Sequence, residues 1–182
     1  MLHYDLNLYS SATSYAFTQM IRPAFGAALK IEGGQHYFAR ANVDVMAANR
    51  DPNGGSAVVL SLRAGKSFAL DRHAKVSVFA EYQHLAYGGL YNNGVGGGVS
   101  ATLTYNRFFI SGTAAALYGM SGDVGYHLLS PGNDFIFSGK LGYRFKDKDR
   151  FAPYLFIKQE RYIGRGNALT SRSVGAGIKY RF

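Results

Sequence analysis

The chain has 182 residues, of which 15% are aromatic, with 23 Gly, 4 Pro and neither Cys nor Trp. The absence of Cys excludes a disulfide framework, a thiolate metal site and a Cys nucleophile, and no stretch approaches the roughly 18 apolar residues of a membrane-spanning helix. The formal net charge of +9 would suit a nucleic-acid partner, but Lys and Arg recur singly inside alternating segments, so we expect no nucleic acid as partner.

Ten segments alternate apolar and polar residues with the period of two that β-strands require. In chain order the segments are centred near Leu6, Ala27, Asn42, Ser61, Phe79, Thr102, Thr113, Lys140, Phe156 and Gly177. The pattern predicts one domain over residues 1–182, folded as an all-β, antiparallel, up-and-down transmembrane β-barrel with ten strands. Eight strands remain an alternative if the first segment is not part of the wall.

The last segment shows the alternation most clearly. Its apolar set is Val174, Ala176, Ile178, Tyr180 and Phe182, and the residues between them are small or cationic, namely Gly175, Gly177, Lys179 and Arg181. A barrel in a membrane presents its apolar set to lipid and its polar set to the interior. An outward apolar face therefore explains this pattern without a soluble core.

The connections fall into two sets that alternate along the chain. The short set is EGGQ, LDRH, YNR and KDKD. The longer set is rich in Gly, Asn, Ser and Asp, and consists of SSATSYAFTQMIRP, AANRDPNGG, YGGLYNNG, MSGDVGYHLLSPGND and IGRGNALTS. Membrane barrels have the same asymmetry, with short turns at one end and longer surface loops at the other.

The aromatic C-terminal residue Phe182, preceded by alternate Tyr180 and Ile178, resembles the assembly signal of the bacterial outer-membrane β-barrel proteins. The resemblance implies a location in the bacterial outer membrane, contact with outer-membrane lipid, and insertion by the outer-membrane assembly machinery, which reads the last strand. The first residues, MLHYDLNLYS, lack the basic and apolar regions of a secretory signal. We therefore expect either a mature sequence with a start Met or a C-terminal piece of a longer protein, such as the barrel of a surface-polysaccharide export protein.

The predicted inward faces collect charged residues that a narrow barrel would bring together. They are Lys30, Arg40, Asp44, Arg63, Glu81, Lys140, Arg144, Lys158, Glu160, Lys179 and Arg181, together with Asp5. One interpretation is a salt-bridged network that fills the lumen. The alternative is a narrow, cation-lined path that prefers anions. The sequence favours the largely filled lumen.

An outer-membrane hydrolase is a further alternative, and it would need a nucleophile, a base and an orienting carboxylate near one rim. His84 and His127 fall near the predicted outer rim, and Ser121 and Asp123 lie in the same long connection as His127. No spacing ties these residues together, and Ser and Asp are common in surface loops, so the sequence does not favour an enzyme. We expect no cofactor and no metal site, because no convergent set of His and carboxylates is visible.

These patterns predict a surface-exposed binding or structural protein, or the membrane domain of a polysaccharide export assembly. The connection from Met120 to Asp134 and the aromatic segment YGGLYNN are the expected contact surfaces. Their ligand would be a saccharide or a protein, because Tyr and Asn favour such recognition.

Overall fold

The computed structural model describes residues 2–15, 21–47, 56–87, 90–122, 132–145, 150–164 and 167–182. Ten strands account for nearly all of these residues: β1 (His3–Tyr15), β2 (Ile21–Glu32), β3 (Tyr37–Met46), β4 (Ala57–Ala69), β5 (Ala74–Tyr87), β6 (Leu90–Tyr105), β7 (Phe108–Gly122), β8 (Gly132–Tyr143), β9 (Phe151–Gly164) and β10 (Asn167–Arg181). Every predicted segment centre lies inside its strand, so the prediction of ten strands is confirmed. Among the described residues, no helix is long and apolar enough to cross a membrane.

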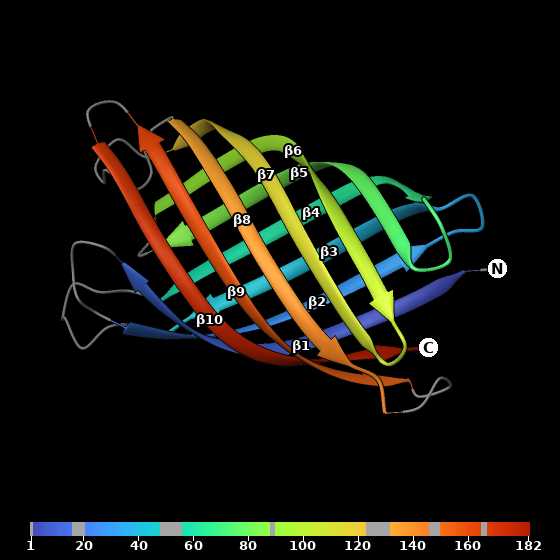
Figure 1. Cartoon of the computed structure of the whole chain (residues 1–182). Coiled ribbons are helices and arrows are strands. Elements are labelled where there is room, and N and C mark those ends of the chain that lie inside the picture. Colours follow the sequence, from blue (N-terminus) through green and yellow to red (C-terminus); the bar gives the residue numbers. More distant parts are fainter. Residues whose placement is uncertain are drawn as a thin grey trace.

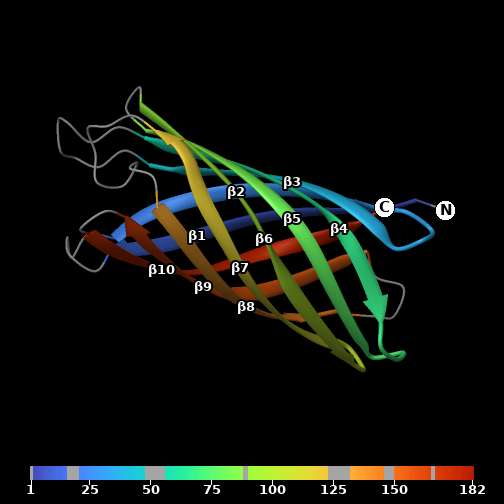
Figure 2. The ribbon, with the colours of Figure 1, turned by 90° about the horizontal axis from the view of Figure 1, so that it is seen from above.

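Each strand pairs antiparallel with its neighbours in sequence, and β1 pairs with β10 to close the barrel (Figure 1). The closing register runs from Asp5 opposite Arg181 to Tyr15 opposite Ser171. Both termini lie at the same end, as an even number of strands requires (Figures 1 and 2). We call this the turn end, because the connections 33–36, 70–73 and 106–107 lie there, and we call the opposite end the loop end.

The strands extend further toward the loop end than the sequence pattern predicted. β1 continues to Tyr15, β2 begins at Ile21, β9 continues to Gly164 and β10 begins at Asn167. The segments SSATSYAFTQMIRP and IGRGNALTS were therefore wrongly predicted as loops over most of their length, and so was YGGLYNNG, which β5 and β6 largely contain. Strand pairing satisfies the hydrogen bonds of backbone N–H and C=O groups whatever the side chains are. A strand that is polar on both faces lacks the alternation of apolar and polar residues by which the sequence identifies a strand.

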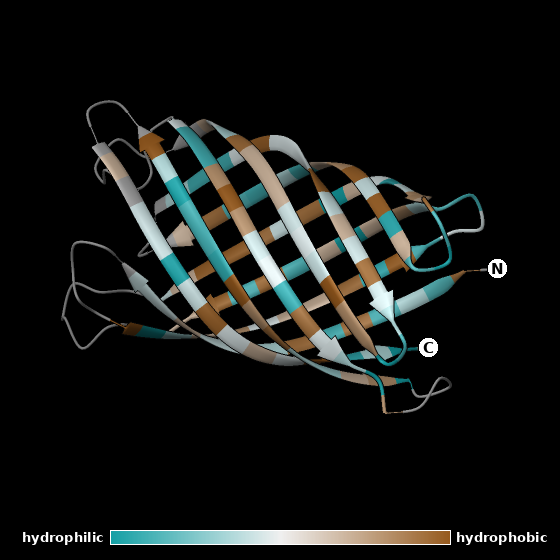
Figure 3. Ribbon diagram, in the orientation of Figure 1, coloured by the Kyte–Doolittle hydropathy of each residue, from teal (hydrophilic) through white to brown (hydrophobic). Residues whose placement is uncertain are grey.

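Apolar and polar residues alternate along the strands (Figure 3), and the large apolar residues are exposed on the outer face of the wall. Phe25, Leu155 and Val174 expose 63%, 64% and 64% of their surface. Near the turn end, aromatic rings of the outer face touch between neighbouring strands, with centroids 5.0 Å apart for Phe108 and Tyr143 and 4.6 Å apart for Phe151 and Tyr180. A bilayer explains this exposure, because lipid solvates an apolar band and aromatic girdles mark its edges.

Inside the barrel, aromatic rings lie over glycines of the neighbouring strand. Phe109 of β7 stands opposite Gly142 of β8, and a Cβ at Gly142 would collide with the ring. Tyr154 covers Gly177 of β10 in the same way. These rings cover the exposed backbone of an inward glycine, which would otherwise weaken the strand.

Candidate functional site

The described residues line two cavities in the lumen. The loop-side cavity has a volume of about 330 Å³ and is lined by residues of all ten strands, among them Asp44, Arg63, Glu81, Lys158 and Glu160. The turn-side cavity has a volume of about 420 Å³, and its lining includes Asp5, Arg144, Lys179 and Arg181. Both lie within the polar interior that the alternation of side chains creates.

The two cavities share five lining residues, which we call the shared layer: Lys30, Arg40, Thr102, Ser111 and Lys140. Lys30 pairs with Glu32, with its Nζ 2.7 Å from Oε2. Arg40 and Lys140 have no carboxylate partner among the described residues, and Nε of Arg40 is buried there without a hydrogen-bond acceptor. Lys140 instead lies over the ring of Tyr154, with Nζ 4.0 Å from the centroid.

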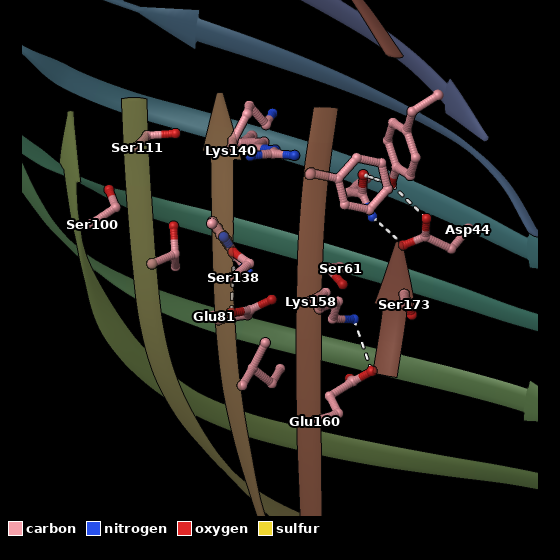
Figure 4. Close-up of a pocket in the computed structure, with 18 of the residues that line it drawn as sticks. Asp44, Ser61, Glu81, Ser100, Ser111, Ser138, Lys140, Lys158, Glu160 and Ser173 are labelled. Carbon is pink, nitrogen blue, oxygen red and sulfur yellow. Dashed lines mark hydrogen bonds and ion pairs between the residues drawn. The ribbon is translucent and has the colours of Figure 1, made fainter. Parts of the chain in front are cut away.

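Carboxylates neutralise many of the other cations. Near the turn end, the carboxylate of Asp5 pairs with Nζ of Lys179 at 2.8 Å and with Nε of Arg181 at 2.9 Å. On the loop side, Nζ of Lys158 pairs with Oε2 of Glu160 at 2.9 Å (Figure 4). Asp44 accepts hydrogen bonds from the Tyr9 hydroxyl at 2.5 Å and the Asn42 amide at 2.6 Å. The charge of the lumen is therefore mixed on the loop side and predominantly basic on the turn side.

Small hydroxyl side chains form a continuous part of the lumen wall. Ser100 and Thr102 of β6, Ser111 and Thr113 of β7 and Ser138 of β8 all line the loop-side cavity. Figure 4 shows Ser100, Ser111 and Ser138 on neighbouring strands, with Lys140 and Lys158 beside them. Because these side chains are short, this part of the wall leaves space for the cavity.

Every residue of the predicted lumen set lines one or both cavities. Lys30, Arg40 and Lys140 line both; Asp44, Arg63, Glu81, Lys158 and Glu160 line the loop-side cavity; Arg144, Lys179 and Arg181 line the turn-side cavity. Sequence reasoning missed Lys75 and Glu32, which form an ion pair. It also missed Arg150 at the mouth of the turn-side cavity. Lys75 is separated by one residue from inward Ser77, so the same alternation could have found it.

The proposed hydrolytic residues are not assembled by the part of the chain that the structure describes. His84 lies on the outer face of β5, where its Nδ1 is 2.7 Å from Oδ1 of Asn93 and its ring stacks on Tyr91. His127 and Asp123 lie outside the described residues, and the side chain of Ser121 is not described either. His84 therefore contacts amide and aromatic groups on the outside of the wall and no lumen carboxylate.

The predicted assembly residues lie on the outer face of the last strand. Ile178 and Phe182 expose 52% and 60% of their surface, and the ring of Tyr180 packs between Phe151 and Phe182. The backbone N–H of Phe182 donates to the carbonyl of Tyr4 at 3.0 Å, so the C-terminus pairs with the first strand. Of the predicted contact surfaces, residues 123–131 lie outside the described part of the chain.

No protein-family model and no curated protein matches the sequence, whereas solved structures match the fold. The outer-membrane protease OmpT from Escherichia coli has a TM-score of 0.65 at 11% identity, covering 100% of this chain and 96% of that one. The NanC porin has a TM-score of 0.51 at 12% identity, covering 95% and 98%. Neisserial surface protein A has a TM-score of 0.47 at 8% identity, covering 100% and 97%.

At these identities the likeness concerns the fold alone. Barrels of this kind turn their short connections toward the periplasm and their longer loops outward, and on this rule the turn end is the periplasmic end. The chain is therefore a closed ten-stranded barrel with the fold of the bacterial outer-membrane proteins. Its apolar outer face suits a location in the outer membrane.

Proposed function

We propose that the barrel is a narrow pore through which small anions cross the outer membrane. The observation that carries this proposal is the shared layer, where two cavities meet at three cations. Two of these cations, Arg40 and Lys140, have no carboxylate partner among the described residues. Positive groups in a narrow passage with low-dielectric walls attract anions and repel cations.

The position of the two unpaired cations supports this reading. β3 and β8 are five strands apart in the closed order of ten, so Arg40 and Lys140 approach from opposite walls. Two like charges that face each other across a lumen repel, and an anion between them relieves that repulsion. The shared layer is therefore the predicted selectivity filter of the pore.

The side chains of the shared layer suit passage as well as selection. Lys30 and Lys140 have flexible stems, and exposed rotamers change within picoseconds to nanoseconds. Thr102 and Ser111, on the same layer, are short and offer hydroxyl donors to a partly dehydrated anion. Rotation of lysine side chains away from this wall would join the two cavities without any movement of the strands.

Planar-bilayer recording under a potassium chloride gradient tests the proposal. We expect the wild-type reversal potential to lie toward the chloride equilibrium potential, and we expect Arg40→Gln with Lys140→Gln to move it toward zero. Arg161→Gln removes the same kind of charge from the outer face of β9 and should leave the reversal potential unchanged. An absence of conductance, or a preference for potassium, would contradict the proposal.

The comparison of reversal potentials requires that each variant is folded. Heat-modifiable migration on a denaturing gel, together with a β-type circular dichroism spectrum, establishes folding for each refolded sample. The two cavities favour the pore over the filled lumen that the sequence favoured. Recognition of a saccharide or protein at the outer loops, and a role in polysaccharide export, stay predictions.

A further inference from the structure

The turn-side cavity has a charge composition unlike that of the rest of the lumen. Seven described basic side chains line it, and Asp5 is the one side-chain carboxylate among the described lining residues. The seven are Lys30, Arg40, Lys140, Arg144, Arg150, Lys179 and Arg181. The loop-side cavity, by contrast, has three carboxylates in its described lining, at Asp44, Glu81 and Glu160.

Ion pairs account for three of these seven cations. Asp5 is shared by Lys179 and Arg181, and Lys30 pairs with Glu32. Arg40, Lys140, Arg144 and Arg150 have no carboxylate partner among the described residues. Their neutral contacts include the Tyr180 hydroxyl, 3.5 Å from Arg150.

We propose that the turn-side cavity is a binding site for a small polyvalent oxyanion of the phosphate class. The inference deepens the proposed pore, because Arg40 and Lys140 of the shared layer form the inner end of the site. A dianion interacts with several unpaired cations at once, so its attraction exceeds that of chloride. Guanidinium groups bind tetrahedral oxyanions through paired N–H donors, and a lysine adds a compact charge.

The uncharged lining of the cavity also suits an oxyanion. Asn7, Thr102 and Ser111 line the cavity beside the cations and supply amide or hydroxyl donors. The volume of about 420 Å³ leaves room for a phosphate with part of its hydration shell. These neutral groups would donate hydrogen bonds to those oxygen atoms of the bound anion that the cations do not contact.

The site faces one side of the membrane. Arg144 directly follows β8, Arg150 directly precedes β9, and both lie at the turn end with Phe182. An anion therefore meets Arg144 and Arg150 first when it enters from the turn end, which is the periplasmic end. Arg40 and Lys140 lie deeper, at the boundary with the loop-side cavity.

Titration of the refolded barrel with inorganic phosphate tests the site. Calorimetry in detergent at pH 8 and constant ionic strength would compare phosphate with chloride, since phosphate is mostly a dianion at this pH. We expect phosphate to bind and chloride not to compete at equal concentration. Arg144→Gln, at the exposed mouth, should weaken phosphate binding about tenfold, because a charge-assisted contact is lost.

Arg161→Gln is the matched control, because Arg161 lies on the outer face of β9 and cannot reach the lumen. We expect this variant to bind phosphate as the wild type does. No phosphate binding, or equal weakening by Arg161→Gln and Arg144→Gln, would overturn the inference. Lys140→Gln gives a second reading from the inner end of the cavity, where weakening of phosphate binding is also expected.

Calorimetry and bilayer recording separate this inference from the pore. Phosphate binding without conductance would support the site and contradict the pore. Anion-selective conductance without phosphate binding would support the pore and overturn the site.

Discussion

Arg63 of β4 and Glu81 of β5 stand directly opposite each other inside the barrel, with Nε of the arginine 3.0 Å from Oε2 of the glutamate. The glutamate side chain is only 1% exposed. Arg63 also lies over the ring of Phe79, with Cζ 4.7 Å from the centroid. This pair contributes to the mixed charge of the loop-side cavity and links the side chains of β4 and β5.

Removal of the carboxylate should destabilise the barrel. Glu81→Ala leaves Arg63 inside the lumen without its partner, and breaking a buried ion pair in this way costs about 3–5 kcal/mol. Urea unfolding of the protein in lipid vesicles measures the loss. The double variant Arg63→Gln with Glu81→Gln removes both charges and should lose less than Glu81→Ala; an equal or larger loss would show that the pairing contributes little.

Phe79 lines the loop-side cavity, so its truncation should change conductance and stability together. Phe79→Ala removes a ring that is 8% exposed, and such a truncation costs about 3–5 kcal/mol in a packed core. The lumen becomes wider at the same place, so we expect a larger single-channel conductance. Phe68→Ala, on the outer face of β4, is the control and should leave conductance unchanged; an unchanged conductance in Phe79→Ala would show that the ring does not narrow the path.

Because the ring of Phe109 covers Gly142, we predict that a larger side chain at Gly142 destabilises the barrel. Gly142→Val would force the ring out of its position, and overpacking of this kind costs about 1–3 kcal/mol. Gly112 of β7 has open space on its outer side, where a Cβ would meet no atom closer than 3.9 Å. Gly112→Val should therefore unfold at nearly the wild-type urea concentration, and equal destabilisation by both substitutions would contradict the packing of Phe109 over Gly142.

Phe182 is predicted to act in assembly more than in the folded state. Phe182→Ala removes an exposed ring and keeps the backbone hydrogen bond to Tyr4, so we expect refolding in detergent to proceed almost as in the wild type. In cells, the same substitution should reduce the amount of folded barrel in the outer-membrane fraction. Normal amounts in that fraction would show that Phe182 is not part of an assembly signal.

The alternation of side chains was sufficient to predict ten strands and, in the clearly alternating segments, the side of the wall that a residue faces. In β10, for example, Lys179 and Ile178 lie on opposite faces, as the period of two requires. The register between strands was not predictable, and the register determines which charges meet. Nothing local in the sequence relates Asp5 to Arg181, which are paired because the barrel closes between its first and last strands.

The distribution of charge along the barrel axis also escaped prediction. The sequence shows twelve charged residues on inward faces, but the position of each residue along the barrel axis depends on the register between the strands. Only the structure separates a turn-side cavity with Asp5 as its one described side-chain carboxylate from a loop-side cavity with mixed charge. The cover of Gly142 by Phe109 depends on the same register, so this contact could not be predicted from the sequence.

The chain has no Cys, so a single introduced thiol can report on the lumen. We would place it at Ser138, which lines the loop-side cavity, and compare its rates of reaction with anionic and cationic methanethiosulfonate reagents in membranes. We expect the thiol to react, with the anionic reagent reacting faster, and we expect Phe137→Cys, which faces lipid, to react with neither reagent. A Ser138→Cys variant that reacts with neither reagent, or faster with the cationic one, would contradict an anion-preferring path through the barrel.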